Sequence, residues 1–371
     1  MSDLYRSAIS ARIDKLPQSP TAAPYEIEDG EEDEEENDSV ASLPSMPPPR
    51  SSIQKPKTRK KRSPNPEYSP ISAAGYFDQA VEVTVPAVGL NFRVYYSPPT
   101  VVGGTVMICH HGAGYSGLSF ACFTKEVMAQ TNGKTKLIDD SMSDADLSVE
   151  VLSRDAYNLL LTLFPKPAET PTFLLVGHSM GGSVLVRTCP MLIESKYRVT
   201  GVAVLDVVEG SAIDALPFMN KLLDSRPNGF DSIEEAVEWH VSNHTIRNPQ
   251  SARISVPSLF VQSESPNDHE HEFKWRTPLR STAQYWESWF LGLSSKFLAV
   301  RAARLLVLAG TDRLDKELMI GQMQGKFQMI VVPDTGHMIH EDNPERLADI
   351  LMEFWRRNER VVKGVKKVGE L

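Results

Sequence analysis

The chain has 371 residues, a hydrophobic fraction of 41% and a formal net charge of −9 at pH 7, which is the composition of a globular protein with one large domain or two small ones. No apolar run reaches the roughly 18 to 20 residues of a membrane-spanning helix, and the negative charge argues against nucleic acid as the main partner. We therefore expect a soluble, monomeric protein of the cytoplasm, with the nucleus as an alternative compartment, that binds neither membrane nor nucleic acid.

Residues 1–75 have the composition of a disordered tail. They lack sustained apolar periodicity and contain an acidic block at 26–38 and a basic block, KPKTRKKR, at 55–62. Low hydrophobicity with blocks of like charge is typical of disordered segments. The basic block is a candidate nuclear import signal, a docking patch for an acidic partner or a solvated linker. A second, basic tail is expected at 359–371.

Between the tails, residues 76–358 alternate strand-like with helical segments. The segments 80–85 and 90–96 predict an antiparallel opening hairpin. Five apolar runs follow, each stopped by a polar residue or glycine, at 106–112, 172–179, 199–206, 304–310 and 327–337. Such alternation predicts a mainly parallel sheet with helices on both faces. In open sheets of this class the chemistry gathers at the carboxyl ends of the strands, where these polar residues stand.

The strongest motif is Gly177-His178-Ser179-Met180-Gly181, which follows an apolar strand and precedes a helical segment. This G-x-S-x-G pattern, in this context, is the nucleophile turn of the α/β-hydrolase fold. The turn holds the serine in a strained conformation, and small residues on either side let backbones approach. A chance glycine-rich turn is the competing interpretation. The pattern predicts Ser179 as the nucleophile of a serine carboxylesterase.

A serine hydroxyl needs a base to attack an ester, and a carboxylate must orient that base. His337 follows the last predicted strand, which is where the histidine stands in the chain order of this fold. His340 is expected to be a structural or a helix-capping residue. Two aspartates end neighbouring strands, Asp206 and Asp312, and the chain order leaves both open as the acid. The commoner position in this fold, after the penultimate strand, favours Asp312.

An oxyanion hole is expected from two backbone N–H groups, those of Met180 and Ala113. Ala113 belongs to an HGxG loop at 111–114, which His110 and His111 are expected to shape. We expect no metal and no cofactor, and the cysteines, Cys109, Cys122 and Cys189, stand in neither CxxC nor metal-ligand spacing. They are predicted to be reduced core thiols.

The segment 207–300 is an insert between two predicted sheet strands. It contains helical stretches rich in aromatic residues, separated by a polar loop at 263–271. Inserts of this size commonly form a lid that sets substrate selectivity and gates access. We therefore expect a helical lid over the site, although most of its aromatics are ordinary core residues.

Four stretches carry a more specific resemblance: VGHSMGGSVLVR, LDVVEGSAIDALP, FKWRTPLRSTAQYWESWFLGLS and LAGTDRLDKELMIGQMQGKFQMIVVPDTGHMIHEDNP. Over residues 69–357 the sequence resembles the protein phosphatase methylesterases, particularly fungal ones. These remove the methyl ester from the C-terminal leucine of the protein phosphatase 2A catalytic subunit. The resemblance implies that subunit as partner, a triad that becomes productive when the partner docks, and Ser179, Asp206 and His337 as the triad. We take Asp206 as the predicted acid on this ground.

The sequence departs from that family after residue 131. The fold needs a further parallel strand before the helix predicted at 147–164, but the segment 131–146 contains none. Family members have there an apolar strand ending in an Asp-x-Arg-x-His-Gly-x-Thr pattern. Its loss would separate the opening hairpin from the catalytic half of the sheet. We expect lowered stability, because an exposed edge would replace a strand buried on both faces.

Two other functions compete with a phosphatase methylesterase. A broad small-ester hydrolase would share the triad and cleave many acyl esters. A non-catalytic module that binds the phosphatase would tolerate the loss of a core strand.

Overall fold

The structure, a computed structural model, describes residues 63–97, 104–131, 146–264, 271–310 and 314–359. The acidic and basic blocks, the segment 132–145, Asp312 and the C-terminal tail lie outside these residues. All described residues belong to one compact unit that starts at Arg62, upstream of the expected boundary at 76. The early residues are held there because the Ile71 N–H donates to the Arg253 carbonyl at 3.0 Å, and the Arg253 guanidinium donates to the Ser69 carbonyl at 2.7 Å.

The strands stand close to the positions that the apolar runs predict. In chain order the hairpin and the central sheet comprise β1 (Gln79–Val85), β2 (Leu90–Tyr96), β3 (Thr105–His110), β4 (Thr172–His178), β5 (Val199–Leu205), β9 (Ala303–Leu308) and β10 (Gln328–Val331). The covering helices are α2 (Ala121–Thr131), α3 (Val149–Leu163), α4 (Met180–Glu194), α9 (Leu293–Ala299), α10 (Lys316–Met323), α11 (Ile339–Asp342) and α12 (Pro344–Glu359). Short 3-10 turns are η1 (Pro66–Tyr68), η2 (Gly117–Phe120), η3 (Val256–Leu259) and η4 (Leu279–Tyr285).

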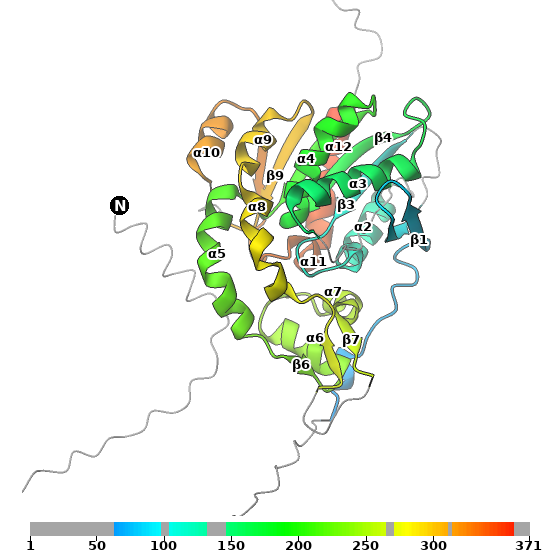
Figure 1. Cartoon of the computed structure of the whole chain (residues 1–371), viewed down its shortest axis with the longest axis vertical. Helices are drawn as coiled ribbons and strands as arrows, with labels where there is room; N and C mark the ends of the chain where they lie inside the picture. Colours follow the sequence, from blue (N-terminus) through cyan, green and yellow to red (C-terminus); the bar gives the residue numbers. More distant parts are fainter. Residues whose placement is uncertain (1–62, 98–103, 132–145, 265–270, 311–313, 360–371) are drawn as a thin grey trace, which may run out of the picture. The chain divides into compact units, whose positions relative to one another are not determined.

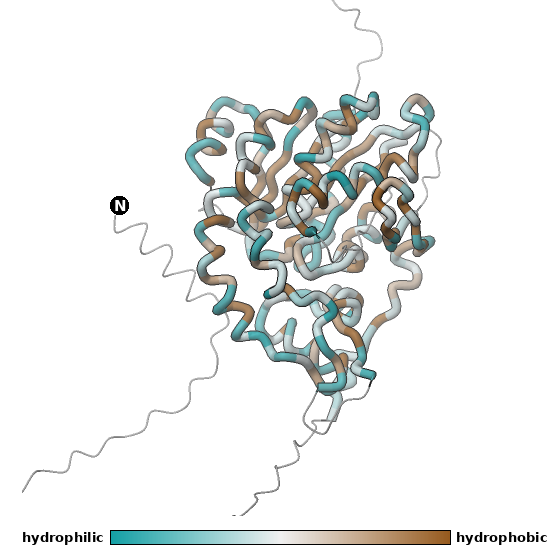
Figure 2. Tube along the Cα trace, in the orientation of Figure 1, coloured by the Kyte–Doolittle hydropathy of each residue, from teal (hydrophilic) through white to brown (hydrophobic). Residues whose placement is uncertain are grey.

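The central sheet has five strands in the order β10-β9-β5-β4-β3, and every neighbouring pair is parallel. Side chains alternate between two apolar layers, as the period of two in a strand requires. In β3, Val106 and Ile108 join the layer of α3 and α4, whereas Met107 and Cys109 join the layer of α2 and α12. Figures 1 and 2 show the sheet between these helices and the apolar residues along its strands. The predicted α/β architecture is confirmed.

The opening hairpin is separate from this sheet. Strands β1 and β2 pair antiparallel in a two-stranded sheet of their own, and β3 is the last strand of the central sheet as described. Side-chain packing still joins the hairpin to the sheet, because Phe92 and Val94 share the apolar cluster of Val106 and Ile108. This is the arrangement expected when the sheet lacks the strand predicted to follow α2 in the chain, which would lie in space between the hairpin and β3.

The insert lies between β5 and β9 and comprises α5 (Glu209–Asp224), β6 (Gly229–Phe230), α6 (Ile233–Ser242), α7 (Pro249–Ser255), β7 (Phe260–Gln262), β8 (Phe273–Trp275) and α8 (Trp286–Phe290), followed by α9. The expectation of helices alone was incomplete, because β6, β8 and β7 form a small antiparallel sheet. Strands of two or three residues are too short to show an alternating pattern. Aromatic packing holds them: the Phe260 ring lies 4.5 Å from the Trp275 ring and 5.3 Å from the Phe230 ring.

Cys109, Cys122 and Cys189 are buried free thiols, as predicted. Among the described helices, none is long and apolar enough to cross a bilayer.

Candidate active site

Ser179 stands in a strained turn between β4 and α4. Its backbone has φ 53° and ψ −123°, a conformation that costs a non-glycine residue about 1–3 kcal/mol. The Ser179 N–H donates to the Leu205 carbonyl at 3.0 Å, and its own carbonyl accepts from the Gly182 N–H at 2.9 Å. These bonds tie the turn to β5 and to the first turn of α4. Ser179 is half-buried.

The glycines around Ser179 are required by close backbone packing. A Cβ at Gly177 would overlap the backbone of Gly181, and one at Gly181 would overlap the carbonyl oxygens of His110 and His111. Backbone atoms cannot move aside as a flexible side chain can. The G-x-S-x-G pattern thus lets β4, α4 and the loop after β3 meet at the serine.

His337 is hydrogen-bonded to Asp206 across the ends of two strands. The His337 Nδ1 lies 2.8 Å from the Asp206 Oδ2, and the other carboxylate oxygen accepts from the Ala309 N–H at 2.9 Å. The Asp206 side chain is fully buried, whereas half of the His337 side chain is exposed. A buried carboxylate bound to Nδ1 leaves Nε2 as the accessible basic nitrogen.

Further hydrogen bonds hold the loop that carries His337. Asp342 accepts from the Gly336 N–H and from the Arg247 N–H, both at 2.7 Å. The Arg247 guanidinium also donates to the carbonyl of Asp334 at 3.0 Å, and Asp334 has a positive φ of 59°. The insert therefore braces the His337 loop through Arg247.

The three predicted triad residues come from one edge of the sheet. Ser179 follows β4, Asp206 follows β5 with a positive φ of 49°, and His337 lies between β10 and α11. The ring of His178, the residue before the serine, lies 4.6 Å from the His337 ring. A nucleophile turn, an imidazole and a buried carboxylate in this arrangement can perform acyl transfer. Asp312, the alternative acid, lies outside the described residues.

Comparison with known proteins agrees with this geometry. The sequence model of a family described as "Alpha/beta hydrolase family" matches residues 107–350. A Cryptococcus neoformans protein named "Protein phosphatase methylesterase 1" is 40% identical over 413 residues, covering 100% of this chain and 96% of the relative. The chain belongs to the protein phosphatase methylesterase family. A relative of the same name from Schizosaccharomyces pombe is 39% identical over 306 residues, covering 77% of this chain and 85% of that protein.

Solved structures show the same fold at lower identity. "E-2-(Acetamidomethylene)succinate Hydrolase" has a TM-score of 0.58 at 18% identity, covering 75% of this chain and 99% of that one. An esterase of Mycobacterium tuberculosis has a TM-score of 0.53 at 16% identity, covering 75% and 92%. The methylesterase family is thus an α/β-hydrolase family, as the sequence predicted.

The Cryptococcus methylesterase also bears on the missing strand. Its alignment extends over 413 residues, more than the 371 of this chain. The relative therefore has residues within the alignment that this chain lacks, and a deletion after residue 131 stays a prediction.

The segments that carry the two predicted oxyanion donors, Met180 and Ala113, lie on either side of Ser179. Met180 is the first residue of α4, where backbone N–H groups have no intrahelical partner. The loop of Ala113 approaches from the other side, since a Cβ at Gly112 would lie 3.2 Å from the Ser179 Cβ. Both His110 and His111 bond carbonyls of this loop through Nδ1, at 2.9 and 2.8 Å. The geometry is compatible with both predicted donors.

The sequence did not indicate that two polar residues shortly after His337, His340 and Glu341, are buried. His340 is fully buried, and its ring stacks on Phe120 at 4.3 Å, in keeping with the structural role expected of it. Glu341 is also fully buried, and burial raises the pKa of its carboxyl to about 8 although Ser255 donates a hydrogen bond to it. In sequence these residues read as a polar helix start, so no signal marked them as interior.

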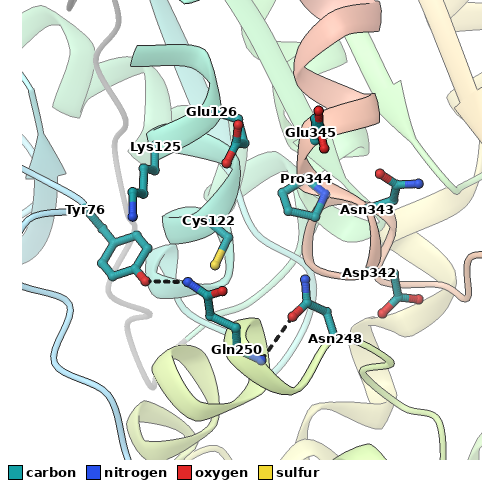
Figure 3. A pocket seen from close by; sticks show the side chains of 10 residues that line it. All are labelled: Tyr76, Cys122, Lys125, Glu126, Asn248, Gln250, Asp342, Asn343, Pro344 and Glu345. Atoms are coloured by element: carbon teal, nitrogen blue, oxygen red, sulfur yellow. Dashed lines mark hydrogen bonds between the residues drawn. The ribbon is translucent and has the colours of Figure 1, made fainter. Parts of the chain in front are cut away.

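A polar cavity of about 370 Å³ lies apart from the triad, which contributes none of its lining (Figure 3). It is lined by Tyr76, Cys122, Lys125, Glu126, Asn248, Gln250, Asp342, Asn343, Pro344 and Glu345. The lining includes one lysine and three carboxylates, and the Gln250 amide donates to the Tyr76 hydroxyl at 2.9 Å. Within the described ranges, no group of three or more His, Cys, Asp and Glu side chains is placed to hold a metal ion.

Proposed function

We propose that this chain is a serine carboxylesterase that removes the methyl ester from the C-terminal leucine of the protein phosphatase 2A catalytic subunit. The observation that carries the proposal is the hydrogen bond from His337 to the buried Asp206, beside the strained turn of Ser179. Relatives named protein phosphatase methylesterase 1 support the substrate.

The proposed reaction has two acyl-transfer steps. The Ser179 Oγ attacks the ester carbonyl while the His337 Nε2 takes its proton, and the carboxylate of Asp206 stabilises the imidazolium. The N–H groups of Met180 and Ala113 donate to the oxyanion. Collapse of the tetrahedral intermediate expels methanol, which takes the proton from His337. Water, deprotonated by His337, then hydrolyses the acyl-enzyme to the free leucine carboxylate and restores the serine.

Apolar residues of the insert lie next to this machinery. Trp286 and Trp289 share a cluster with Met180, and Ala113 and Tyr285 pack against it. Leu279 of η4 contacts the same loop, since a Cβ at Gly114 would lie 2.9 Å from its Cδ1. An apolar wall here suits a leucine ester better than a charged substrate, because burying an unpaired charge is costly.

The decisive experiment compares two substrates. Methylated phosphatase catalytic subunit and p-nitrophenyl acetate are incubated with the chain and with Ser179→Ala, and loss of the methyl group and release of nitrophenol are measured. We expect the wild type to demethylate the phosphatase and Ser179→Ala to be inactive. Fast turnover of the small ester without demethylation would favour a broad esterase.

The separated hairpin favours a second candidate function, a non-catalytic module that binds the phosphatase. That function requires Ser179→Ala to retain phosphatase binding and the wild type to hydrolyse neither substrate. Because an esterase without its nucleophile would also bind the phosphatase, hydrolysis by the wild type separates the two proposals: a wild type that binds the phosphatase and hydrolyses neither substrate favours the module.

A further inference from the structure

His178 connects the nucleophile turn to the loop of the predicted base. It is the last residue of β4 and is 1% exposed. Its Nε2 lies 2.9 Å from the carbonyl oxygen of His337. A carbonyl oxygen can only accept, so Nε2 carries the proton and donates it. The residue before the serine thus holds the backbone of the residue that activates the serine.

The ring of His178 is also enclosed on its other sides. It lies 4.6 Å from the His337 ring and 4.5 Å from the His340 ring. A Cβ at Gly112 would lie 2.8 Å from its Nδ1, so the oxyanion loop packs against it as well. One side chain therefore contacts the segments that carry the nucleophile, the oxyanion donor and the base.

The ring is kept neutral in this place. Burial, followed by the neighbouring charge of His337, lowers the pKa of His178 to about 3. When His337 takes the serine proton during acyl transfer, the new imidazolium meets no second cation beside it. Neutrality also keeps one proton on the ring, at the nitrogen that the His337 carbonyl requires.

We propose that His178 is a positioning residue for the esterase reaction, a role that rests on the proposed function. Its hydrogen bond fixes the backbone of His337 relative to Ser179, while Asp206 fixes the imidazole. Half of the His337 side chain is exposed, so contacts with neighbouring side chains constrain its orientation only on its buried side. Misplacement of a catalytic group by about 1 Å can cost about 100-fold in rate.

The test replaces His178 by Gln, Asn and Leu and measures kcat and KM on p-nitrophenyl acetate. The Gln amide nitrogen extends as far as Nε2, the shorter Asn amide does not, and Leu has no donor. We expect His178→Leu and His178→Asn to lower kcat about 10- to 100-fold with KM within about 3-fold. His178→Gln is expected to stay within about 5-fold of the wild type, because it restores the donor.

His240→Leu is the matched control. His240 is a buried histidine of the insert whose Nδ1 bonds the Ala236 carbonyl at 2.8 Å, and its substitution is expected to lower the melting temperature but not kcat. Three results would overturn the positioning role. The first is that His178→Leu keeps kcat within about 3-fold of the wild type. The others are that His178→Gln is as slow as His178→Asn, or that His240→Leu lowers kcat as much as His178→Leu does. If His178→Leu does not fold, the comparison of Gln with Asn decides. A wild type that hydrolyses neither p-nitrophenyl acetate nor the methylated phosphatase would overturn the proposed function and this role with it, whereas an active wild type with these results overturns only the role.

Discussion

Replacing Asp206 by Asn should inactivate the chain through the tautomer of His337. In the wild type one carboxylate oxygen accepts from the Ala309 N–H and the other faces the His337 Nδ1. The Asn oxygen must stay on Ala309, because leaving that buried N–H without an acceptor costs about 1–3 kcal/mol. The amide NH₂ then faces Nδ1 and forces the proton of His337 onto Nε2. That nitrogen can no longer accept the proton of Ser179.

The same exchange in another triad hydrolase lowers kcat about 10⁴-fold, which corresponds to about 5.5 kcal/mol of transition-state stabilisation. We expect a loss of this order in kcat for p-nitrophenyl acetate, with an unchanged melting profile because the volume is conserved. Asp312→Asn is the matched control and should stay near the wild type. If Asp206→Asn kept more than a tenth of the activity while Asp312→Asn lost it, Asp312 would be the acid and the reasoning refuted.

Three further predictions concern the fold around the site. Gly181→Ala should cost about 3 kcal/mol or more, because its Cβ would lie 2.4 Å from two backbone carbonyl oxygens. Gly182→Ala should cost less, because its Cβ would lie farther from its neighbours, 3.0 Å from the Val204 Cγ1 and 3.1 Å from the Gly177 carbonyl oxygen. Equal urea midpoints of the two variants would contradict this. Between about pH 6.5 and 8 the stability of the wild type should fall as pH rises, because Glu341 stays protonated in the folded state up to about 8 and only the unfolded state releases the proton, with a slope of at most about 1.4 kcal/mol per pH unit. Below about pH 6.5 the buried neutral histidines His178, His240 and His340 have the opposite effect, because only the unfolded state binds their protons. Glu341→Gln should flatten the profile between about pH 6.5 and 8, and an unchanged profile there would disprove the assignment. In calorimetry this chain should melt at a lower temperature and less cooperatively than the Cryptococcus relative, and an equally cooperative melt of a soluble monomer would show that the separated hairpin has no cost.

Much of the fold was predictable because buried parallel strands read as continuous apolar runs. The runs at 172–179 and 199–206 match β4 (Thr172–His178) and β5 (Val199–Leu205) closely. The hairpin was visible from its alternation. The small sheet of the insert was not, because its strands have two or three residues and are held by aromatic packing between distant segments.

The site was predictable in part for a related reason. Ser179 carries a local signal, since the turn chemistry lies within five consecutive residues. The partner of His337 carries none, because Asp206 is 131 residues away and only the strand order brings it near. The role of His178 was hidden for the same reason: within the motif it occupies a variable position, and its carbonyl partner is 159 residues distant.

Reaction of the chain with a fluorophosphonate probe, followed by peptide mapping of the adduct, tests the esterase assignment most directly. The probe phosphonylates a serine only where a base activates the hydroxyl and donors stabilise the oxyanion. We predict one adduct per chain on Ser179, none on Ser179→Ala, and much slower labelling of His337→Ala. A wild type that stays unlabelled with the phosphatase catalytic subunit present, or equal labelling of the wild type and Ser179→Ala, would contradict the proposed site.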